Sequence, residues 1–270
     1  MGAKKARSGA LLEAHGRLDV RVYKVGGPAV EDPQLIGPLA EEVRRSGGHP
    51  VLVHGGGRHV ERMLRVLGIE SSFVNGRRET SPAAMEVVEM VLSGVVNKSL
   101  ASELTAAGVR AVGLSGRDAA LLTAQPVPEL GRVGSRVAAH PEAILALWNA
   151  GLLPVVSPVS NGPAGEALNV NADEAALGLA RALFARSLVY LSDVDGVQVD
   201  GETAEELDAA HAERLIEDGT IAGGMALKVR VALEASRAGI PEVVIAGRAR
   251  LEGGFPGTRI SARVAQELRA

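Results

Sequence analysis

Three glycine-rich segments, two of which carry a lysine, hold the residues of this sequence best suited to chemistry. They are residues 24–27 (Lys-Val-Gly-Gly), 54–57 (His-Gly-Gly-Gly) and 223–228 (Gly-Gly-Met-Ala-Leu-Lys). Glycines at strand ends let backbone N–H groups approach an anion, and a following helix N-terminus adds partial positive charge. A lysine beside such a turn can neutralise charge on a transferring phosphoryl group. Together the three segments indicate a kinase site.

Asp173 closes the segment Asn-Val-Asn-Ala-Asp (residues 169–173), directly before an expected helix. Its spacing alone favours a helix N-cap. The alternative is that Asp173 orients the two lysines of the site, while Asn169 hydrogen-bonds a substrate. A second polar turn, residues 191–198, follows an apolar run, where α/β folds bind ligands. This turn could bind the adenine or ribose of a nucleotide. The alternative is a polar turn without a ligand.

An Asn-Gly turn at residues 75–76 precedes the paired arginines Arg77 and Arg78. An arginine fork suits bidentate capture of a carboxylate. For Arg77 we expect a solvent-facing turn instead. Glu79 directly follows Arg78 and is a candidate ion-pair partner for it. Such a pair would weaken the binding of a substrate carboxylate to Arg78.

Short, mostly continuous apolar runs alternate with helical patterns along the chain. Continuous runs are typical of strands buried on both faces of a parallel sheet. The alternation predicts an α/β class protein, a three-layer α/β/α sandwich on a mainly parallel sheet. The expected strands are 20–23, 51–53, 112–114, 152–156, 188–191 and 243–245, the expected helices include 35–43, 85–92, 143–148, 175–184 and 227–238, and residues 121–137 suggest a β-hairpin.

Composition narrows the class of protein. The 270 residues are 46% hydrophobic but 2% aromatic, so the core must be aliphatic. A net charge of −3 suggests neither nucleic-acid nor membrane-surface binding, and no apolar run reaches membrane-spanning length. There is no cysteine, which excludes disulfides and Cys-ligated zinc, and the six histidines show no ligand spacing. We expect a cytoplasmic protein with a short N-terminal tail (residues 1–17).

Ten segments in order resemble the amino-acid kinase superfamily, and within it the branch that phosphorylates N-acetylglutamate. The resemblance runs from about residue 20 to 260. It rests on residues 24–27, 53–57, 75–80, 85–92, 96–100, 113–118, 169–173, 191–197, 219–225 and 257–260.

The resemblance implies the amino-acid kinase fold with two lobes. Residues 18–160 would bind the amino-acid substrate and dimerise, and residues 161–270 would bind nucleotide. The implied reaction is ATP-dependent phosphorylation of the γ-carboxylate of N-acetyl-L-glutamate, in arginine biosynthesis. Mg²⁺ would be carried by the nucleotide, with no metal ligand from the protein, and the protein would be a homodimer.

The resemblance also implies residue roles. The implied catalytic residues are Lys24, Lys228 and Asp173, with Asp173 holding the two lysines. The implied substrate-binding residues are Gly56, Gly57, Arg78 and Asn169. The implied nucleotide-binding residues are Gly26, Gly27, Asp193, Val194, Asp195, Gly196, Val197, Gln198, Thr220, Ile221 and Ala222.

Two other functions remain open at this stage. One is the related kinase of lysine biosynthesis, which acts on aminoadipate attached to an acidic carrier protein. A basic rim for such a carrier is available from Arg77, Arg78, Arg132 and Arg136. The other is a catalytically silent nucleotide-binding regulator on the same fold, which would bind ATP without forming ADP.

Overall fold

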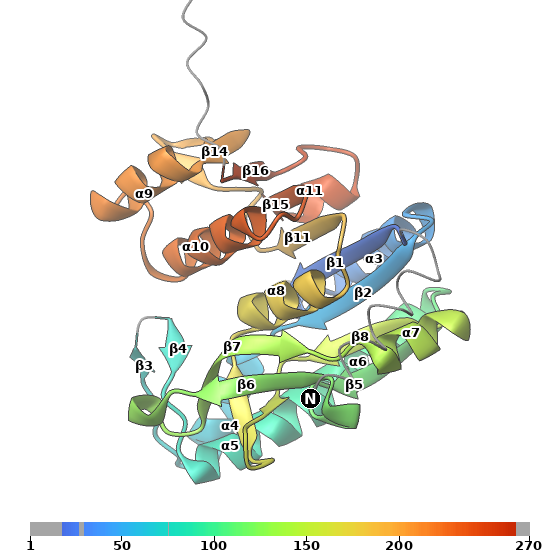
Figure 1. Cartoon of the computed structure of the whole chain (residues 1–270), viewed down its shortest axis with the longest axis vertical. Coiled ribbons are helices and arrows are strands. Elements are labelled where there is room, and N and C mark those ends of the chain that lie inside the picture. The colour runs from blue at the N-terminus through green and yellow to red at the C-terminus, as the bar shows by residue number, and fades with distance from the viewer. Residues whose placement is uncertain (1–17, 27–29, 75, 263–270) are drawn as a thin grey trace, which may run out of the picture.

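An eight-stranded sheet forms the centre of the molecule (Figure 1). The computed structural model describes residues 18–26, 30–74 and 76–262. The strand order is β14 (Glu206–Asp208), β16 (Thr258–Ser261), β15 (Glu242–Ala246), β11 (Ser187–Leu191), β1 (Val20–Val25), β2 (His49–His54), β8 (Leu153–Ser157) and β5 (Ala111–Ser115). All neighbours are parallel except β15 and β16. The expected mainly parallel sheet is therefore confirmed.

Successive side chains of the central strands enter two different apolar clusters. In β11, Leu188 belongs to one cluster and Val189 to the other. The same alternation separates Val51 from Leu52 in β2. Because strand side chains point to opposite faces in turn, a continuous apolar run is what a sheet covered on both faces requires.

Helices cover both faces, which confirms the three-layer α/β/α sandwich. Apolar residues of α7 (Glu142–Asn149), α8 (Ala172–Ala182), α9 (Ala209–Glu217) and α10 (Gly223–Arg237) join the first cluster. Those of α3 (Ile36–Arg45), α6 (Asn97–Ala106) and α11 (Arg248–Leu251) join the second. Figure 1 shows α8 and α10 in front of the sheet and α3 behind it.

Smaller elements surround the end of the sheet at which β1 and β2 finish. The expected hairpin is confirmed as the antiparallel pair β6 (Leu122–Pro126) and β7 (Val133–Ala139), which form a small barrel with β9 (Ser160–Asn161) and β10 (Ala167–Val170). Two short hairpins are β3 (Phe73–Val74) with β4 (Arg77–Arg78) and β12 (Gln198–Val199) with β13 (Glu202–Thr203). The remaining helices in the described ranges are α4 (Gly57–Val66), α5 (Pro82–Glu89), the π-helical stretch η2 (Met90–Val96) and three short 3₁₀ turns at Pro33–Leu35, Asp118–Ala120 and Pro128–Leu130.

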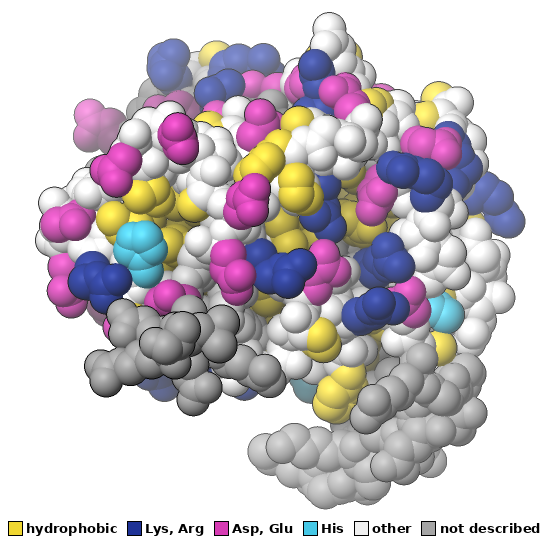
Figure 2. All heavy atoms as spheres, turned by 90° about the horizontal axis from the view of Figure 1, so that it is seen from above, with side chains coloured by type: hydrophobic (Ala, Val, Ile, Leu, Met, Phe, Trp, Pro, Cys, Tyr) yellow, Lys and Arg dark blue, Asp and Glu magenta, His cyan; other side chains and the backbone are white. Residues whose placement is uncertain are grey.

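Charges of both signs are mixed over the face shown in Figure 2. Lysine and arginine side chains alternate there with aspartate and glutamate, without a continuous basic field. None of the helices in the described ranges is long and apolar enough to cross a membrane.

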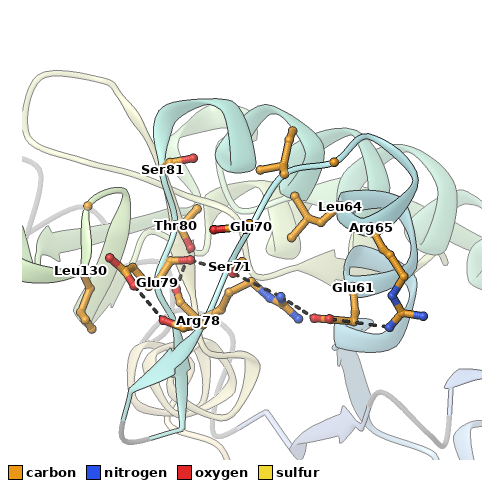
Figure 3. Close-up of a pocket in the computed structure, with 14 residues that line it drawn as sticks. Glu61, Leu64, Arg65, Glu70, Ser71, Arg78, Glu79, Thr80, Ser81 and Leu130 are labelled. Atoms are coloured by element: carbon orange, nitrogen blue, oxygen red, sulfur yellow. Dashed lines mark hydrogen bonds and ion pairs between the residues drawn. The ribbon is translucent and has the colours of Figure 1, made fainter.

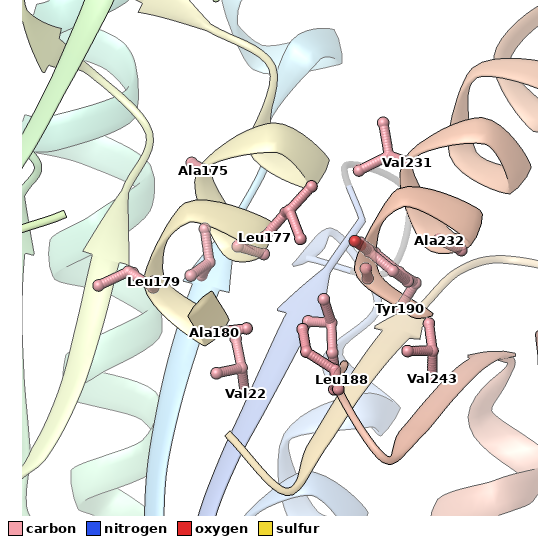
Figure 4. Close-up of a cluster of buried hydrophobic side chains, with 14 of the residues drawn as sticks. Val22, Ala175, Leu177, Leu179, Ala180, Leu188, Tyr190, Val231, Ala232 and Val243 are labelled. Carbon is pink, nitrogen blue, oxygen red and sulfur yellow. The ribbon is translucent and has the colours of Figure 1, made fainter. Parts of the chain in front are cut away.

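One polar group lies in the first cluster without a protein partner. Tyr190 of β11 is fully buried, and its hydroxyl makes no hydrogen bond to any residue that the structure describes. Figure 4 shows its ring among aliphatic side chains, with the hydroxyl oxygen between α8 and α10. Burial raises the pKa of this hydroxyl well above its ordinary value, so it stays protonated. A buried hydroxyl without a partner costs free energy of folding.

Tyr190→Phe is therefore expected to leave the free energy of unfolding unchanged or raise it by up to about 1 kcal/mol. Urea denaturation measures this. The matched control is Tyr23→Phe on the other side of the sheet, where the hydroxyl donates to Glu42 Oε1 at 2.9 Å. That variant should lose about 1–2 kcal/mol. Equal losses in both variants would show that Tyr190 has a partner.

Candidate active site

Lys24 lies near the end of β1, with its side chain on the α8 and α10 side of the sheet. Its neighbours Tyr23 and Val25 both enter the opposite cluster, so strand alternation turns Lys24 toward α8. The residue is 7% exposed. A lysine this deeply buried requires an anionic partner.

That partner is Asp173, which binds both expected lysines. Lys24 Nζ lies 2.8 Å from Asp173 Oδ1, and Lys228 Nζ lies 3.4 Å from Asp173 Oδ2. The interpretation of Asp173 as a helix cap is wrong: Asn171 is the N-cap of α8, and its side chain accepts from the Asp173 N–H at 2.8 Å. The carboxylate of Asp173 is thereby left to bridge the two ammonium groups.

The cluster holds two positive charges and one negative. Burial acts to raise the pKa of Asp173, but Lys24 and Lys228 outweigh it, so the pKa lies below its ordinary value. Burial above all, and then the ammonium of Lys24, lower the pKa of Lys228 to about 8 although Asp173 opposes them. The surplus positive charge is suited to an anionic ligand such as a phosphoryl group.

A cavity of about 210 Å³ beside this cluster is lined by six of the predicted residues. Its lining includes the catalytic candidates Lys24 and Asp173. It also includes all four substrate-binding candidates, Gly56, Gly57, Arg78 and Asn169. These residues come from β1, the β2–α4 turn, β4, β10 and α8, so the fold brings together five separate parts of the chain.

The glycine turn after β2 is tightly packed. A Cβ on Gly56 would lie 2.8 Å from Leu92 Cδ2 of η2, so a larger residue would force the Leu92 side chain to move. Below the turn, buried His54 contacts the Gly55 carbonyl through Nδ1 at 2.7 Å and Asn97 Nδ2 through Nε2 at 3.0 Å. Burial lowers the pKa of His54 to about 4, so the ring is neutral, donates from Nδ1 and accepts at Nε2. His54 is therefore a hydrogen-bonding residue that links the glycine turn to Asn97.

Arg78 lies in the wall of the same cavity and is 7% exposed. The interpretation of Glu79 as its partner is wrong. Glu79 accepts instead from Ser72 Oγ at 2.7 Å, whereas Arg78 Nη1 donates to Glu61 Oε2 at 2.7 Å. Asn169 Nδ2 donates to Thr80 Oγ1 at 3.0 Å, two residues beyond Arg78.

The expected nucleotide-binding residues lie next to the cluster but outside this cavity. The Gly26 N–H donates to the Leu191 carbonyl at 2.9 Å, beside the turn that contains residues 193–198. Residues 220–222 directly precede α10, the helix that carries Lys228. Gly27 lies outside the described residues. Both segments therefore lie near the edge of the sheet at which β1 ends.

Several residues of the site were not predicted. Gly55 lines the cavity, although only Gly56 and Gly57 of this turn were expected to bind substrate. Arg77, expected in solvent, pairs with Glu174 at 2.7 Å and joins the β3–β4 hairpin to α8. Glu61 follows Gly57 by four residues, so helical spacing places it one turn beyond the glycine turn. No signal in the sequence links it to Arg78.

Comparison with known proteins decides the family. A family model described as amino acid kinase family matches residues 19–247. The chain belongs to the amino acid kinase family. Within it, the acetylglutamate kinase of Rubrobacter xylanophilus is 46% identical over 248 residues, 91% of this chain and 97% of that relative. The acetylglutamate kinase of a Jannaschia species is 45% identical over 231 residues, 84% of this chain and 81% of that relative.

Solved structures share the fold of this kinase. A Streptococcus mutans protein superimposes with a TM-score of 0.80 at 25% identity, covering 91% of this chain and 99% of its own. The carbamate kinase of Giardia lamblia bound to AMP-PNP gives 0.65 at 18% identity, covering 91% and 99%. At such an identity the second likeness concerns the fold alone.

The charge of Lys228 gives this kinase an expected pH dependence. With a pKa of about 8, the ammonium of Lys228 is present below that pH and is lost as pH rises through it. We expect kcat/KM for ATP, which reports ionisations of the free enzyme, to fall roughly tenfold per pH unit above a pH of about 8. This falling part of the profile is the alkaline limb. Lys228→Arg, whose guanidinium stays charged, should be slower but lose the limb. Steady-state kinetics from pH 6 to 10 test this.

The control for that profile is Arg237→Ala, which removes an exposed cation from the same helix. Its profile should match the wild type. Asp173→Asn removes the group that raises the pKa of Lys228, so any residual activity should decline at lower pH. A limb that persists unchanged in Lys228→Arg would assign the ionisation to another group.

Proposed function

We propose that this protein transfers the γ-phosphoryl group of ATP to the γ-carboxylate of N-acetyl-L-glutamate, the acetylglutamate kinase step of arginine biosynthesis. The observation that carries the proposal is the pair of lysines bridged by Asp173, beside a cavity lined by glycines and a buried arginine. The 42–46% identity to acetylglutamate kinases supports the substrate.

The reaction forms a bond between a γ-carboxylate oxygen and the γ-phosphorus and breaks the bond from that phosphorus to the β–γ bridging oxygen. ADP leaves with that oxygen. The attacking carboxylate is already ionised at neutral pH, so no general base is needed. Catalysis then depends on in-line positioning and on charge stabilisation by Lys24 and Lys228. Asp173 holds both lysines and lets them face the same phosphoryl group.

Arg78 and Asn169 are the proposed binding residues for the acylated amino acid. The guanidinium of Arg78 can take the α-carboxylate in a bidentate pair. Backbone N–H groups of Gly56 and Gly57, at the N-terminus of α4, add donors and partial positive charge. The segments 193–198 and 220–222, with Gly26, are proposed to contact the nucleotide.

Mg²⁺ is proposed to enter with ATP as part of the substrate. The described residues contain no group of three or more histidine, aspartate or glutamate side chains arranged for a metal. Asp173 is occupied by its two lysines. Mg²⁺ often keeps its waters and binds mainly through substrate phosphates, which fits such a site.

Acyl-phosphate formation tests the function directly. With Mg-ATP and hydroxylamine, N-acetylglutamate should give an acyl-hydroxamate, and free glutamate or N-acetylaminoadipate should give at least about tenfold less, since a misplaced carboxylate loses alignment. Lys24→Ala should lose about 10³-fold in kcat because one phosphoryl-stabilising charge is removed. Preference for the aminoadipate compound would instead assign the protein to lysine biosynthesis. ATP binding without any hydroxamate would identify a regulator.

We also propose a homodimer, with residues 18–160 providing its interface. Met90 and Val95 of η2 are 58% and 54% exposed, and exposed apolar side chains that lie close together can mark a protein–protein contact. Val95→Asp should shift the protein toward monomer in analytical ultracentrifugation, since a charge in an apolar contact is costly. Val66→Asp, on α4 and 74% exposed, is the matched control and should leave the mass unchanged.

A further inference from the structure

Arg78 separates two cavities. It lines the cavity of about 210 Å³ that contains Lys24 and Asp173, and also a second one of about 900 Å³. The second cavity is lined by Glu61, Arg65, Glu70 and Glu79 among others, and by none of the catalytic candidates. Arg78 is therefore accessible to groups on both sides of this wall.

The two ends of the guanidinium have different partners. Nη1 donates to Glu61 Oε2 at 2.7 Å and to Ser71 Oγ at 3.3 Å, on the side of the second cavity. Nη2 lies 3.4 Å from the carbonyl oxygen of Gly57, on the side of the catalytic cavity. The Phe73 ring lies 4.5 Å from the guanidinium carbon. Figure 3 shows Arg78 and Glu61 pointing toward each other.

Within the described ranges, Glu61 is the carboxylate in ion-pair contact with this buried cation. The Arg78 side chain is 6% exposed and that of Glu61 is 45% exposed. A buried charge without a partner is strongly destabilising, so Glu61 supports the protein while no substrate is bound. The pair also lowers the pKa of Glu61, which keeps the carboxylate ionised.

We propose that Glu61 is a resident counter-ion that competes with the substrate α-carboxylate for Arg78 and so sets the affinity for the acylated amino acid. The inference rests on the proposed function, because it assigns Arg78 to that carboxylate. Two carboxylates on one guanidinium repel each other, so binding of the second weakens the first.

Glu61 has an alternative partner when it leaves Arg78. Arg65, one helical turn further along α4, has its Nη2 3.8 Å from Glu61 Oε1 and is largely exposed. The cavity of about 900 Å³ gives the Glu61 side chain space to turn. Exchange between a buried and an exposed arginine requires only a rotamer change on a rigid helix.

Glu61→Gln tests the competition, because it keeps the length and an acceptor oxygen but removes the charge. We expect KM for N-acetylglutamate to fall roughly fivefold, the scale of a partly exposed ion pair, with kcat within about twofold of the wild type. Glu70→Gln is the matched control. It removes an exposed carboxylate from the same cavity without contact to Arg78 and should change neither constant.

A substrate analogue separates competition from a general structural effect. When the α-carboxylate of N-acetylglutamate is replaced by a carboxamide, Glu61→Gln should leave its KM unchanged, because a neutral group does not compete for Arg78. Glu61→Asp keeps the charge but shortens the reach, so its KM for N-acetylglutamate should lie between the wild type and Glu61→Gln. It keeps the question testable if the neutral variant does not fold.

The outcomes distinguish the two proposals. If the wild type does not phosphorylate N-acetylglutamate, the proposed function fails. If the wild type is active but KM of Glu61→Gln rises or stays unchanged, the competition is wrong, and a rise would make Glu61 a residue that orients Arg78. An equal fall in KM for the carboxamide analogue would also overturn it.

Discussion

The bridge from Asp173 to Lys24 and Lys228 is the interaction on which the rest of this structure depends. Three buried ionisable groups are stable only if they meet within hydrogen-bonding distance, and breaking such a contact costs several kcal/mol. Yet the three residues come from β1, α8 and α10, separated by up to 204 positions in the chain (from 24 to 228). The fold must therefore hold a strand and two helices in a fixed arrangement.

The strand order of the sheet and the helices that cover its two faces produce this fixed arrangement. β1 lies between β11 and β2, so the carboxyl ends of these three parallel strands bring the turns after Val25, His54 and Leu191 to one edge. Aliphatic side chains of α8 and α10 pack on the same face of the sheet (Figure 4). This packing holds Asp173 of α8 within reach of both Lys24 and Lys228. Because ligand sites of open α/β sheets form at such edges, the site follows from the topology.

The local patterns predicted six of the eight strands of the sheet, since continuous apolar runs have a local physical cause. The ion-pair and hydrogen-bond partners of the charged groups were harder to predict from the sequence. Asp173 was taken first for a cap, although Asn171 two residues earlier supplies the capping oxygen. Glu79 was a candidate partner of Arg78 because it is adjacent in sequence. Adjacent residues of an extended segment point to opposite sides, and the true partner Glu61 lies 17 residues away on a helix.

The positive charge of the two lysines and that of Arg78 are neutralised to different extents. This difference affects how each part of the site binds an anion. Lys24 and Lys228 share one carboxylate, so a positive charge remains for the phosphoryl group. Arg78 is paired closely with the carboxylate of Glu61, which neutralises its charge. Under the proposed function, the two lysines attract the phosphoryl group without displacing a partner, whereas Arg78 binds the substrate carboxylate only as strongly as Glu61 gives way. A half-exposed glutamate beside a buried arginine weakens substrate binding without touching the groups that perform the transfer.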